Sequence, residues 1–370
     1  MAFSAVEFSA MLKHGRAPTR FTQRPPSPAR RGAVGIACSA NQATTQIKAP
    51  ITLIKGLEEV ADKYDAFLID QWGVMHDGKE AYPGAVECMN QLTALGKKVV
   101  LLSNSSRRKG NSMAKLAKMG FDTGGIADLV TSGEEAWLKL ASKDKVAPFD
   151  RLGNKVFVFG NGDEDTEYVT SAGLEFCEIQ EADWILARGM FTMHDNLDIL
   201  KREGPDAYPL WEREAQRSLQ IGAENGLPML ITNPDFVRPD GNDSPMPGRL
   251  AETYEKMLAN QLCGERLVFY VGKPHSLVYE TALARLADEL GAEVDKTRVC
   301  AIGDSMLHDI QGAMRLGIDS VLIADGIHAE KLGIKQGVPG QTVGLDKLEE
   351  LRKELWLHPR PSYVVPHFQW

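Results

Sequence analysis

The stretch FLIDQWGVMHDG, Phe67–Gly78, decides the fold. Its apolar beginning is typical of a buried strand, which ends at one carboxylate, Asp70, before a turn that contains Gly73. A carboxylate presented in this way is suited to act as a nucleophile. Such a nucleophile usually works with a second carboxylate two residues later as a proton donor, but Trp72 occupies that position. The sequence therefore leaves three alternatives: an enzyme without this acid, an enzyme with a different acid, or no enzyme.

Strands and helices alternate around this stretch. Short apolar runs are followed by amphipathic segments, one of which has Thr131 or Ser132 at its N-cap. This order predicts an α/β fold with a doubly wound parallel sheet, and the same alternation returns late in the chain. The expected strands are 64–70, 97–106, 266–273, 297–305 and 319–326, the expected helices are 83–96, 110–120, 275–291 and 308–317, and 127–142 is expected to hold a short strand and then a helix.

A segment with strands of its own separates these two halves. Strands are expected at 155–161, 184–190 and 228–234, with an acidic helix at 206–225. Because the segment is too long for a loop, it predicts a second domain inserted into the first. Arg188 in this insertion is a candidate for contacting an anionic substrate. The predicted limits are 50–142 and 243–357 for the core, 143–242 for the inserted domain, 1–46 for an N-terminal extension and 358–370 for a C-terminal tail, which could pack on the body or extend from it.

Charge separates the N-terminal extension from the rest of the chain. The 370 residues have a net charge of −8, yet residues 1–46 hold six basic residues and one acid, so that this +5 leaves −13 for the remainder. A basic, hydroxyl-rich and acid-poor beginning predicts a transit peptide with processing near Cys38, to the chloroplast stroma or, alternatively, the mitochondrion. The acidic body argues against nucleic acid as a partner. The sequence also has no run of about 18 apolar residues, which argues against a membrane span.

Polar residues follow four of the expected strands. They are Asp70, the pair Ser103 and Asn104, Lys273, and Asp304. In open parallel sheets, ligands bind beyond the carboxyl ends of the strands. The fold is therefore expected to gather these residues at one edge, although they are far apart in the sequence.

Together these residues could carry out chemistry on a phosphate group. Asp70 and Asp304 would repel each other unless a hard divalent cation such as Mg²⁺ bound with them. The Ser103 hydroxyl and the backbone N–H groups after it suit phosphate oxygens. Lys273 would supply a fixed positive charge, and Asp70 could then attack phosphorus to form an aspartyl phosphate.

These segments resemble the four motifs of the haloacid dehalogenase superfamily. DQWGVMHDG at 70–78, followed by YPG at 82–84, is similar to its class IIA branch, which includes nitrophenyl phosphatases, phosphoglycolate phosphatases and nucleotidases. The resemblance spans about 60–340, with the motifs in the family's order. It is strengthened by TNPD at 232–235, MPG at 246–248, VGKPHSLVYETAL at 271–283 and IGDSMLHDIQGA at 302–313.

The resemblance implies a Rossmann-like core with an inserted C2-type α/β cap. It implies a Mg²⁺-dependent phosphohydrolase of a small phosphorylated metabolite, because the cap excludes macromolecules. It leaves the oligomeric state open, with a homodimer as one alternative, because the cap often mediates dimers in the family. By this resemblance, Asp70 is the nucleophile, and Ser103, Asn104 and Lys273 bind phosphate. Lys273 also stabilises charge, and Asp309 supports the metal or Lys273. The metal is bound by Asp70, Asp304 and the backbone carbonyl of Trp72.

The sequence departs from the family at the side chain of Trp72. The usual residue there is an aspartate that protonates the leaving oxygen, and an indole cannot donate a proton near neutral pH. Hydrolysis could be limited to good leaving groups, another residue such as His76 or Asp77 could be the acid, or the protein could bind a phosphorylated ligand without turnover. Dehalogenase-like chemistry is less favoured: haloalkanoate dehalogenases carry an aromatic residue at this position, but the cap and flanking motifs resemble the phosphatases.

Overall fold

The computed structural model describes most of the chain beyond the N-terminal extension. The described residues are 50–142, 145–162, 164–195, 198–201, 207–237, 245–259, 266–338, 340–355 and 359–370. The predicted transit peptide (1–46) and its processing site near Cys38 lie outside them. Within the described residues, no helix has both the length and the apolar character that crossing a membrane requires.

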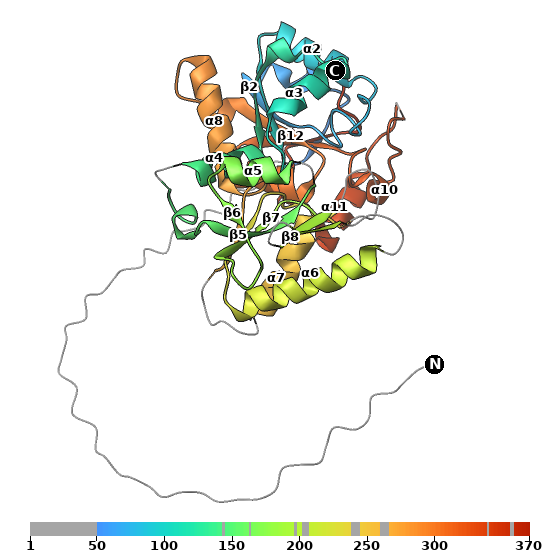
Figure 1. Cartoon of the computed structure of the whole chain (residues 1–370). Coiled ribbons are helices and arrows are strands. Elements are labelled where there is room, and N and C mark those ends of the chain that lie inside the picture. The colour runs from blue at the N-terminus through green and yellow to red at the C-terminus, as the bar shows by residue number, and fades with distance from the viewer. Residues whose placement is uncertain are drawn as a thin grey trace, which may run out of the picture. The chain divides into compact units, whose positions relative to one another are not determined.

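The core contains a parallel sheet with β2 near its centre (Figure 1). β2 lies between β12 and β3, and its Ile69 is opposite Ile302 on one side and Leu101 on the other. This arrangement confirms the predicted Rossmann-like parallel sheet. The described strands follow the order β1 (Thr52–Leu53), β14 (Tyr363–Val365), β13 (Asp319–Ile323), β12 (Val299–Gly303), β2 (Ala66–Asp70), β3 (Lys98–Ser103) and β4 (Ile126–Thr131).

Helices cover both faces of this sheet. Phe67 and Ile69 of β2 pack with α2 (Ala85–Ala94) and α3 (Gly110–Lys118) on one face. The alternate side chains, Ala66 and Leu68, face the helices of the other side, as the two-residue period of a strand requires. These helices are α4 (Ser132–Ala141), α8 (Ser276–Leu290) and α9 (Gln311–Leu316). At the start of α4, the Thr131 side chain accepts the N–H of Glu134, so Thr131 is the N-cap.

The C-terminal residues complete the core sheet. β14 pairs with β1 and with β13, and Phe368 after it is buried. Of the two alternatives for the tail, packing against the body is therefore the one observed. The remaining described elements outside the cap sheet are α1 (Glu58–Ala61), η1 (Thr123–Gly125), η2 (Phe149–Arg151), η3 (Lys296–Arg298), the π-helical turn η4 (Met306–Ile310), α10 (Ala329–Leu332) and α11 (Leu345–Glu354).

The inserted domain has a second sheet of its own. Its strands are parallel except at β8 and β9, which form an antiparallel hairpin against β5. Helices α6 and α7 cover the face that points away from the core (Figure 1). The described elements are β5 (Lys155–Gly160), α5 (Asp165–Ser171), β6 (Glu175–Phe176), β7 (Trp184–Ala187), β8 (Thr192–Asp195), β9 (Asp198–Lys201), α6 (Ala207–Glu224), β10 (Met229–Ile231), α7 (Pro247–Ala259) and β11 (Val268–Tyr270).

The strand predicted at 266–273 joins this second sheet, so its assignment to the core sheet is wrong. β11 pairs with β10, with Met229 opposite Val268. Helix α7, which lies between them in the chain, packs against this sheet, and its Tyr254 is fully buried. The cap fold therefore continues to β11, beyond the expected limit at 242, and the chain enters the core again just before Lys273.

The two sheets share one hydrophobic cluster. Leu140 of α4 and Tyr168 of α5 are both part of it, and the Tyr168 hydroxyl donates to the Gly133 carbonyl of α4 at 2.7 Å. Figure 1 places α4 and α5 side by side between the sheets. The core and the inserted domain are thus held together by buried apolar contacts.

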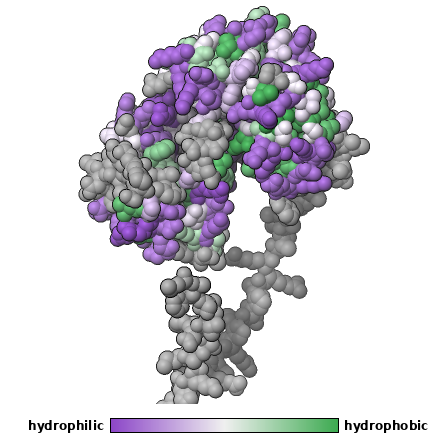
Figure 2. Space-filling model, turned by 90° about the vertical axis from the view of Figure 1, so that its right-hand side faces the viewer, coloured by the Kyte–Doolittle hydropathy of each residue, from purple (hydrophilic) through white to green (hydrophobic). Residues whose placement is uncertain are grey.

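On the face in Figure 2, hydrophilic side chains predominate and hydrophobic ones form small groups between them.

Candidate active site

Three neighbouring strands of the core deliver polar residues to one cavity. Asp70 ends β2, Ser103 ends β3, and Asp304 directly follows β12. These residues line a cavity of about 520 Å³ together with Lys273 and Asp309. The expected gathering of the strand ends is therefore observed, although Lys273 reaches the site from the loop after β11 of the cap sheet.

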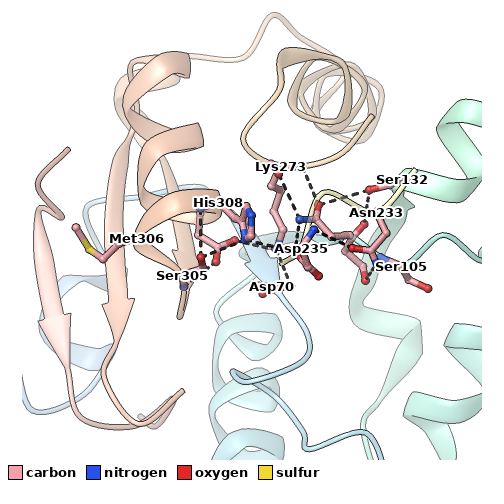
Figure 3. Close-up of polar contacts among 12 residues, drawn as sticks. Asp70, Ser105, Ser132, Asn233, Asp235, Lys273, Ser305, Met306 and His308 are labelled. Carbon is pink, nitrogen blue, oxygen red and sulfur yellow. Dashed lines mark hydrogen bonds and ion pairs between the residues drawn. The ribbon is translucent and has the colours of Figure 1, made fainter. Parts of the chain in front are cut away.

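Lys273 lies between two carboxylates. Its Nζ is 2.6 Å from Oδ1 of Asp70 and 2.8 Å from Oδ1 of Asp309 (Figure 3). Burial would lower the pKa of Lys273, but the charges of Asp309 and Asp70 outweigh burial and raise that pKa above its usual value. Lys273 is therefore a fixed cation beside Asp70.

Both oxygens of Asp309 are engaged within the protein. Oδ1 contacts Lys273, and Oδ2 accepts the backbone N–H of Ser305 at 3.0 Å. The sequence left Asp309 to support either a metal or Lys273. These contacts favour the support of Lys273.

Asp70 and Asp304 supply more negative charge than Lys273 can balance. Together with Asp309 they present oxygens within 4.8 Å of one another. Burial raises the pKa of Asp70 to about 7 against the opposing effect of Lys273. Burial, and then the charges of Asp70 and Asp309, raise the pKa of Asp304 well above its usual value. This donor set of clustered carboxylate oxygens fits a hard divalent cation.

Gly73 allows the loop after Asp70 to pass close to Asp304. Its φ is +89°, and a Cβ there would lie 2.0 Å from Oδ2 of Asp304. The same oxygen accepts the backbone N–H of Ile327 at 2.8 Å, which fixes the carboxylate. A side chain at residue 73 would therefore displace Asp304.

Asn104 holds the backbone of Lys273 in place. Its Oδ1 accepts the Lys273 N–H at 2.7 Å, and its Nδ2 donates to the Lys273 carbonyl at 3.3 Å and to Oδ1 of Asp235 at 2.8 Å. Because these bonds engage its side-chain amide, Asn104 would bind phosphate through its backbone N–H. Ser103 precedes it with a hydroxyl that accepts the N–H of Ser105 at 3.2 Å.

The Trp72 side chain lines the cavity two residues after Asp70. It is half-buried, and its indole lies over Gly78, where a Cβ would be 3.6 Å from the ring. Burial, followed by the charge of Lys115, lowers the pKa of His76 to about 4, and Nδ1 of His76 accepts the N–H of Gly78 at 3.0 Å. His76 is thus neutral at physiological pH and is poorly suited to replace the missing acid.

Asp77, the second nearby candidate acid, is exposed. Its Oδ1 accepts the backbone N–H groups of Lys79 and Glu80 at 2.7 and 2.8 Å. These bonds lower the pKa of Asp77 below its usual value. Asp77 is therefore ionised at neutral pH and has no proton to donate.

Asp235, His308 and Ser305 form a row of polar contacts at the site, and none of these residues was assigned a role from the sequence. His308 Nδ1 is 3.3 Å from Oδ1 of Asp235 and 3.2 Å from Oγ of Ser305 (Figure 3). Asp235 belongs to the TNPD segment, which the resemblance places near the junction of cap and core, and Asn233 accepts its N–H at 3.0 Å. The TNPD segment was the sequence signal that could have indicated a role for Asp235. The contact between Asp235 and His308, in contrast, forms only in the folded chain.

Arg188, the candidate contact for a substrate anion, does not line the cavity. Its side chain is fully buried and forms an ion pair with Asp165 of α5. It also donates to the backbone carbonyl of Ser106 at 3.0 Å. Arg188 therefore joins the cap to the core loop that follows Ser103.

Two family models match the chain. A haloacid dehalogenase-like hydrolase model matches residues 67–175, and a HAD-hydrolase-like model matches residues 270–369. Together the matches cover more than half of the chain, and they include Asp70, Ser103, Lys273 and Asp304.

Characterised relatives and a solved structure agree with these matches. A 4-nitrophenylphosphatase of Schizosaccharomyces pombe is 25% identical over 299 residues, which are 77% of this chain and 92% of that protein. An acid sugar phosphatase of Staphylococcus aureus is 25% identical over 294 residues, 79% of this chain and 98% of that protein. A haloacid dehalogenase-like hydrolase of Brucella suis superposes with a TM-score of 0.63 at 26% identity, over 85% of this chain and 99% of that structure.

Proposed function

Because the chain belongs to the haloacid dehalogenase-like hydrolases, we propose that it is a Mg²⁺-dependent phosphohydrolase that acts on small phosphorylated metabolites with Asp70 as its nucleophile. One observation carries the proposal. Nζ of Lys273 lies 2.6 Å from Asp70 and 2.8 Å from Asp309, so that a fixed cation sits beside the nucleophile. Such a cation favours the ionised form of Asp70 and attracts a phosphate dianion.

Asp70 carries out the chemistry in two displacements. In the first, a carboxylate oxygen of Asp70 forms a bond to phosphorus while the ester P–O bond breaks, which leaves an aspartyl phosphate and releases an alkoxide or phenolate that takes its proton from water. In the second, a water oxygen forms a bond to phosphorus while the P–O bond to Asp70 breaks, which releases inorganic phosphate and the Asp70 carboxylate, and the proton of that water passes to solvent. Lys273 stabilises the charge on the transferred group in both steps.

The residues around Asp70 also fit Mg²⁺. Asp70, Asp304 and the backbone carbonyl of Trp72 would hold the ion. Burial raises the pKa values of both carboxylic acids, and the charges of neighbouring carboxylates add to this effect. When bound, Mg²⁺ would neutralise part of the charge on these carboxylates and on the phosphoryl group.

The loop after β3 would hold the phosphate oxygens. Ser103 offers its hydroxyl, and Asn104 offers its backbone N–H while its side chain fixes Lys273. The Ser103 hydroxyl already accepts the N–H of Ser105 and can still donate its proton to a phosphate oxygen. Asn104 thus acts on the reaction mainly by positioning Lys273.

The cap limits the substrate to small molecules. Phe191 and Met246 of the cap line the same cavity as Asp70, and its volume of about 520 Å³ is typical of sites for metabolites. The two characterised relatives are named for 4-nitrophenyl phosphate and for sugar phosphates. We extend that class of substrate to this chain, with a preference for good leaving groups because Trp72 supplies no proton.

A second candidate function is the binding of a phosphorylated ligand without useful turnover. The observation that favours it is the Trp72 indole at the position of the family's acid, with His76 held neutral and Asp77 held ionised nearby. The phosphate and metal ligands would serve binding equally well. The two functions differ in whether an aspartyl phosphate forms and is hydrolysed.

Steady-state hydrolysis of 4-nitrophenyl phosphate by the full chain separates them. The rate is measured with and without Mg²⁺ for the wild type, for Asp70→Asn and for Asp77→Asn. 4-Nitrophenolate is a good leaving group and hardly needs an acid. The matched control, Asp77, lies in the same loop, but its exposed carboxylate holds only backbone N–H groups.

We expect Mg²⁺-dependent turnover in the wild type and in Asp77→Asn, and no measurable turnover in Asp70→Asn. Mg²⁺ binding is followed separately by calorimetry. Mg²⁺ binding without turnover in the wild type would reject the phosphohydrolase and support the ligand-binding protein. Equal rates in the wild type and Asp70→Asn would reject Asp70 as the nucleophile.

A further inference from the structure

The cavity extends beyond the phosphate-binding residues to a second group of charges. Lys79, Arg107 and Lys115 line it as well, and all three come from the core. They lie on the loop after β2, on the loop after β3 and on α3. A phosphate group alone is much smaller than this cavity, so the rest of a substrate would lie near these cations.

Other cations that line the cavity are already committed to partners. Lys273 is held by Asp70 and Asp309. The Arg108 guanidinium donates to both oxygens of Glu134, at 2.6 and 3.1 Å, and stacks on Trp137 at 3.6 Å from the ring centre. A guanidinium bound in this way has little capacity left for a ligand.

The three outer cations, in contrast, are available. Lys79 and Lys115 have no acidic partner within 4.0 Å among the described residues. Arg107 faces Glu164 of the cap at 3.7 Å, too far for a strong charge-assisted hydrogen bond, and its side chain is 61% exposed. A ligand anion could therefore bind Arg107 by displacing a weak contact.

Acidic side chains also line the cavity, but they do not neutralise Lys79 and Lys115. Asp70 and Asp309 hold Lys273, and the Asp77 carboxylate accepts two backbone N–H groups. Both lysines therefore keep a positive charge that an anionic ligand can bind.

We propose that Lys79, Arg107 and Lys115 form a second anion subsite, so that the substrate is a phosphate monoester with a second anionic group. Its phosphate would lie at Asp70 and Lys273, and a carboxylate or a second phosphate would lie at the subsite. The inference rests on the proposed function for the identity of the first phosphate site. It deepens that function, because it excludes monoesters whose remaining part is neutral as preferred ligands.

Binding to three matched six-carbon ligands tests the subsite. Sorbitol 6-phosphate has no second anion, 6-phosphogluconate has a carboxylate at the far end, and sorbitol 1,6-bisphosphate has a phosphate there. Calorimetry measures the three affinities with the full chain carrying Asp70→Asn, in which the chemical step is blocked. Because no turnover is needed, failure of the subsite is distinguished from failure of hydrolysis, which the 4-nitrophenyl phosphate assay reports.

We expect at least one of the two ligands with a second anionic group to bind about 10-fold more tightly than sorbitol 6-phosphate. The ligand with the larger gain identifies the second anion. Adding Arg107→Gln or Lys115→Gln should reduce the ratio about threefold each, and adding both should bring it close to one. Lys118→Gln is the matched control, because Lys118 is exposed on the same helix but does not line the cavity, and it should leave the ratio unchanged.

Three results would overturn the subsite. The first is equal affinity for all three ligands in the parent chain. The second is an equal loss of affinity for all three ligands in Arg107→Gln and Lys115→Gln, which would assign these residues to general attraction of phosphate. The third is an affinity ratio in Lys118→Gln that falls as far as in Lys115→Gln, which would assign the effect to the charge of the whole face.

Discussion

Arg188 of the cap and Ser106 of the core bind each other's backbone. Nη2 of Arg188 donates to the Ser106 carbonyl at 3.0 Å, and Oγ of Ser106 donates to the Arg188 carbonyl. Ser106 lies three residues after Ser103, on the loop that we propose binds phosphate. The cap is therefore fixed directly to this loop, and both must keep their relative position for the cavity to keep its shape.

Replacing Arg188 should destabilise the whole fold. Arg188→Met leaves Asp165 as a buried charge without its cation, since both side chains of this pair are fully buried. We expect the free energy of unfolding to fall by about 3 kcal/mol. Urea unfolding measures the loss. Arg213→Met is the control, because Arg213 and Glu214 form an exposed pair at 3.1 Å that should contribute less than about 1 kcal/mol. Losses of similar size in both variants would contradict the role assigned to burial.

Asn104→Leu should slow catalysis by releasing Lys273. The variant removes the acceptor for the Lys273 N–H and the donor to the Lys273 carbonyl and to Asp235. A small displacement of a catalytic cation lowers the rate steeply, so we expect kcat for 4-nitrophenyl phosphate to fall by about 10- to 100-fold, with a smaller change in KM. The unfolding midpoint reports whether the variant is folded. An unchanged kcat in a folded variant would show that Lys273 keeps its place without Asn104.

The sequence was sufficient to predict the positions that depend on strand ends. Asp70, Ser103 and Asp304 each follow a strand of one parallel sheet, and the carboxyl ends of such strands lie at the same edge. Neighbouring strands then bring the residues together, whatever their separation in the chain. This is why the positions of the carboxylates and of the loop after β3 could be predicted without any knowledge of side-chain contacts.

Contacts between distant segments could not be predicted in the same way. The apolar pattern of 268–270 indicates a strand but carries no information on which sheet edge it joins, and β11 pairs with β10 of the cap. Arg188 follows a strand of the cap and looked available for a substrate, yet Asp165 and Ser106 surround it in the folded chain. In both cases the partner is chosen by tertiary packing, which local sequence does not encode.

His275 should make the protein less stable in mild acid. Its ring stacks on Tyr270 with the ring centres 4.9 Å apart, and burial lowers its pKa to about 4, compared with about 6.5 in an unfolded chain. Between these two pH values, the unfolded state binds more protons than the folded state. The stability that neutral His275 contributes to the folded state is therefore lost as pH falls below about 6.5.

His275→Phe should remove this part of the acid sensitivity. The variant keeps a ring on Tyr270 but has no group that titrates. Between about pH 7 and pH 5.5, we expect the wild type to lose roughly 1 kcal/mol more of its unfolding free energy than the variant. Urea unfolding at both pH values measures the difference. If both chains lost the same amount, His275 would have the same pKa in the folded and the unfolded state.

Trp72→Asp should restore the missing proton donor. Trp72 lines the cavity two residues after Asp70, and the carboxylates of Asp70 and Asp304 would raise the pKa of a new carboxyl group there. That group would then be protonated near neutral pH and could donate to a departing alkoxide. We expect hydrolysis of sorbitol 6-phosphate to rise by about 10²-fold, while hydrolysis of 4-nitrophenyl phosphate, whose leaving group needs no proton, changes by less than about threefold.

Trp72→Asn distinguishes the effect of an added proton donor from the effect of removing the bulky indole. Asparagine has the size of aspartate and cannot act as an acid, so it should leave the rate for sorbitol 6-phosphate near that of the wild type. A gain in Trp72→Asp alone would show that the other groups of the site are in place and that only the acid is absent. Equal gains in both variants would instead show that the indole had obstructed the substrate, and the absence of a gain in either would place the leaving oxygen out of reach of residue 72.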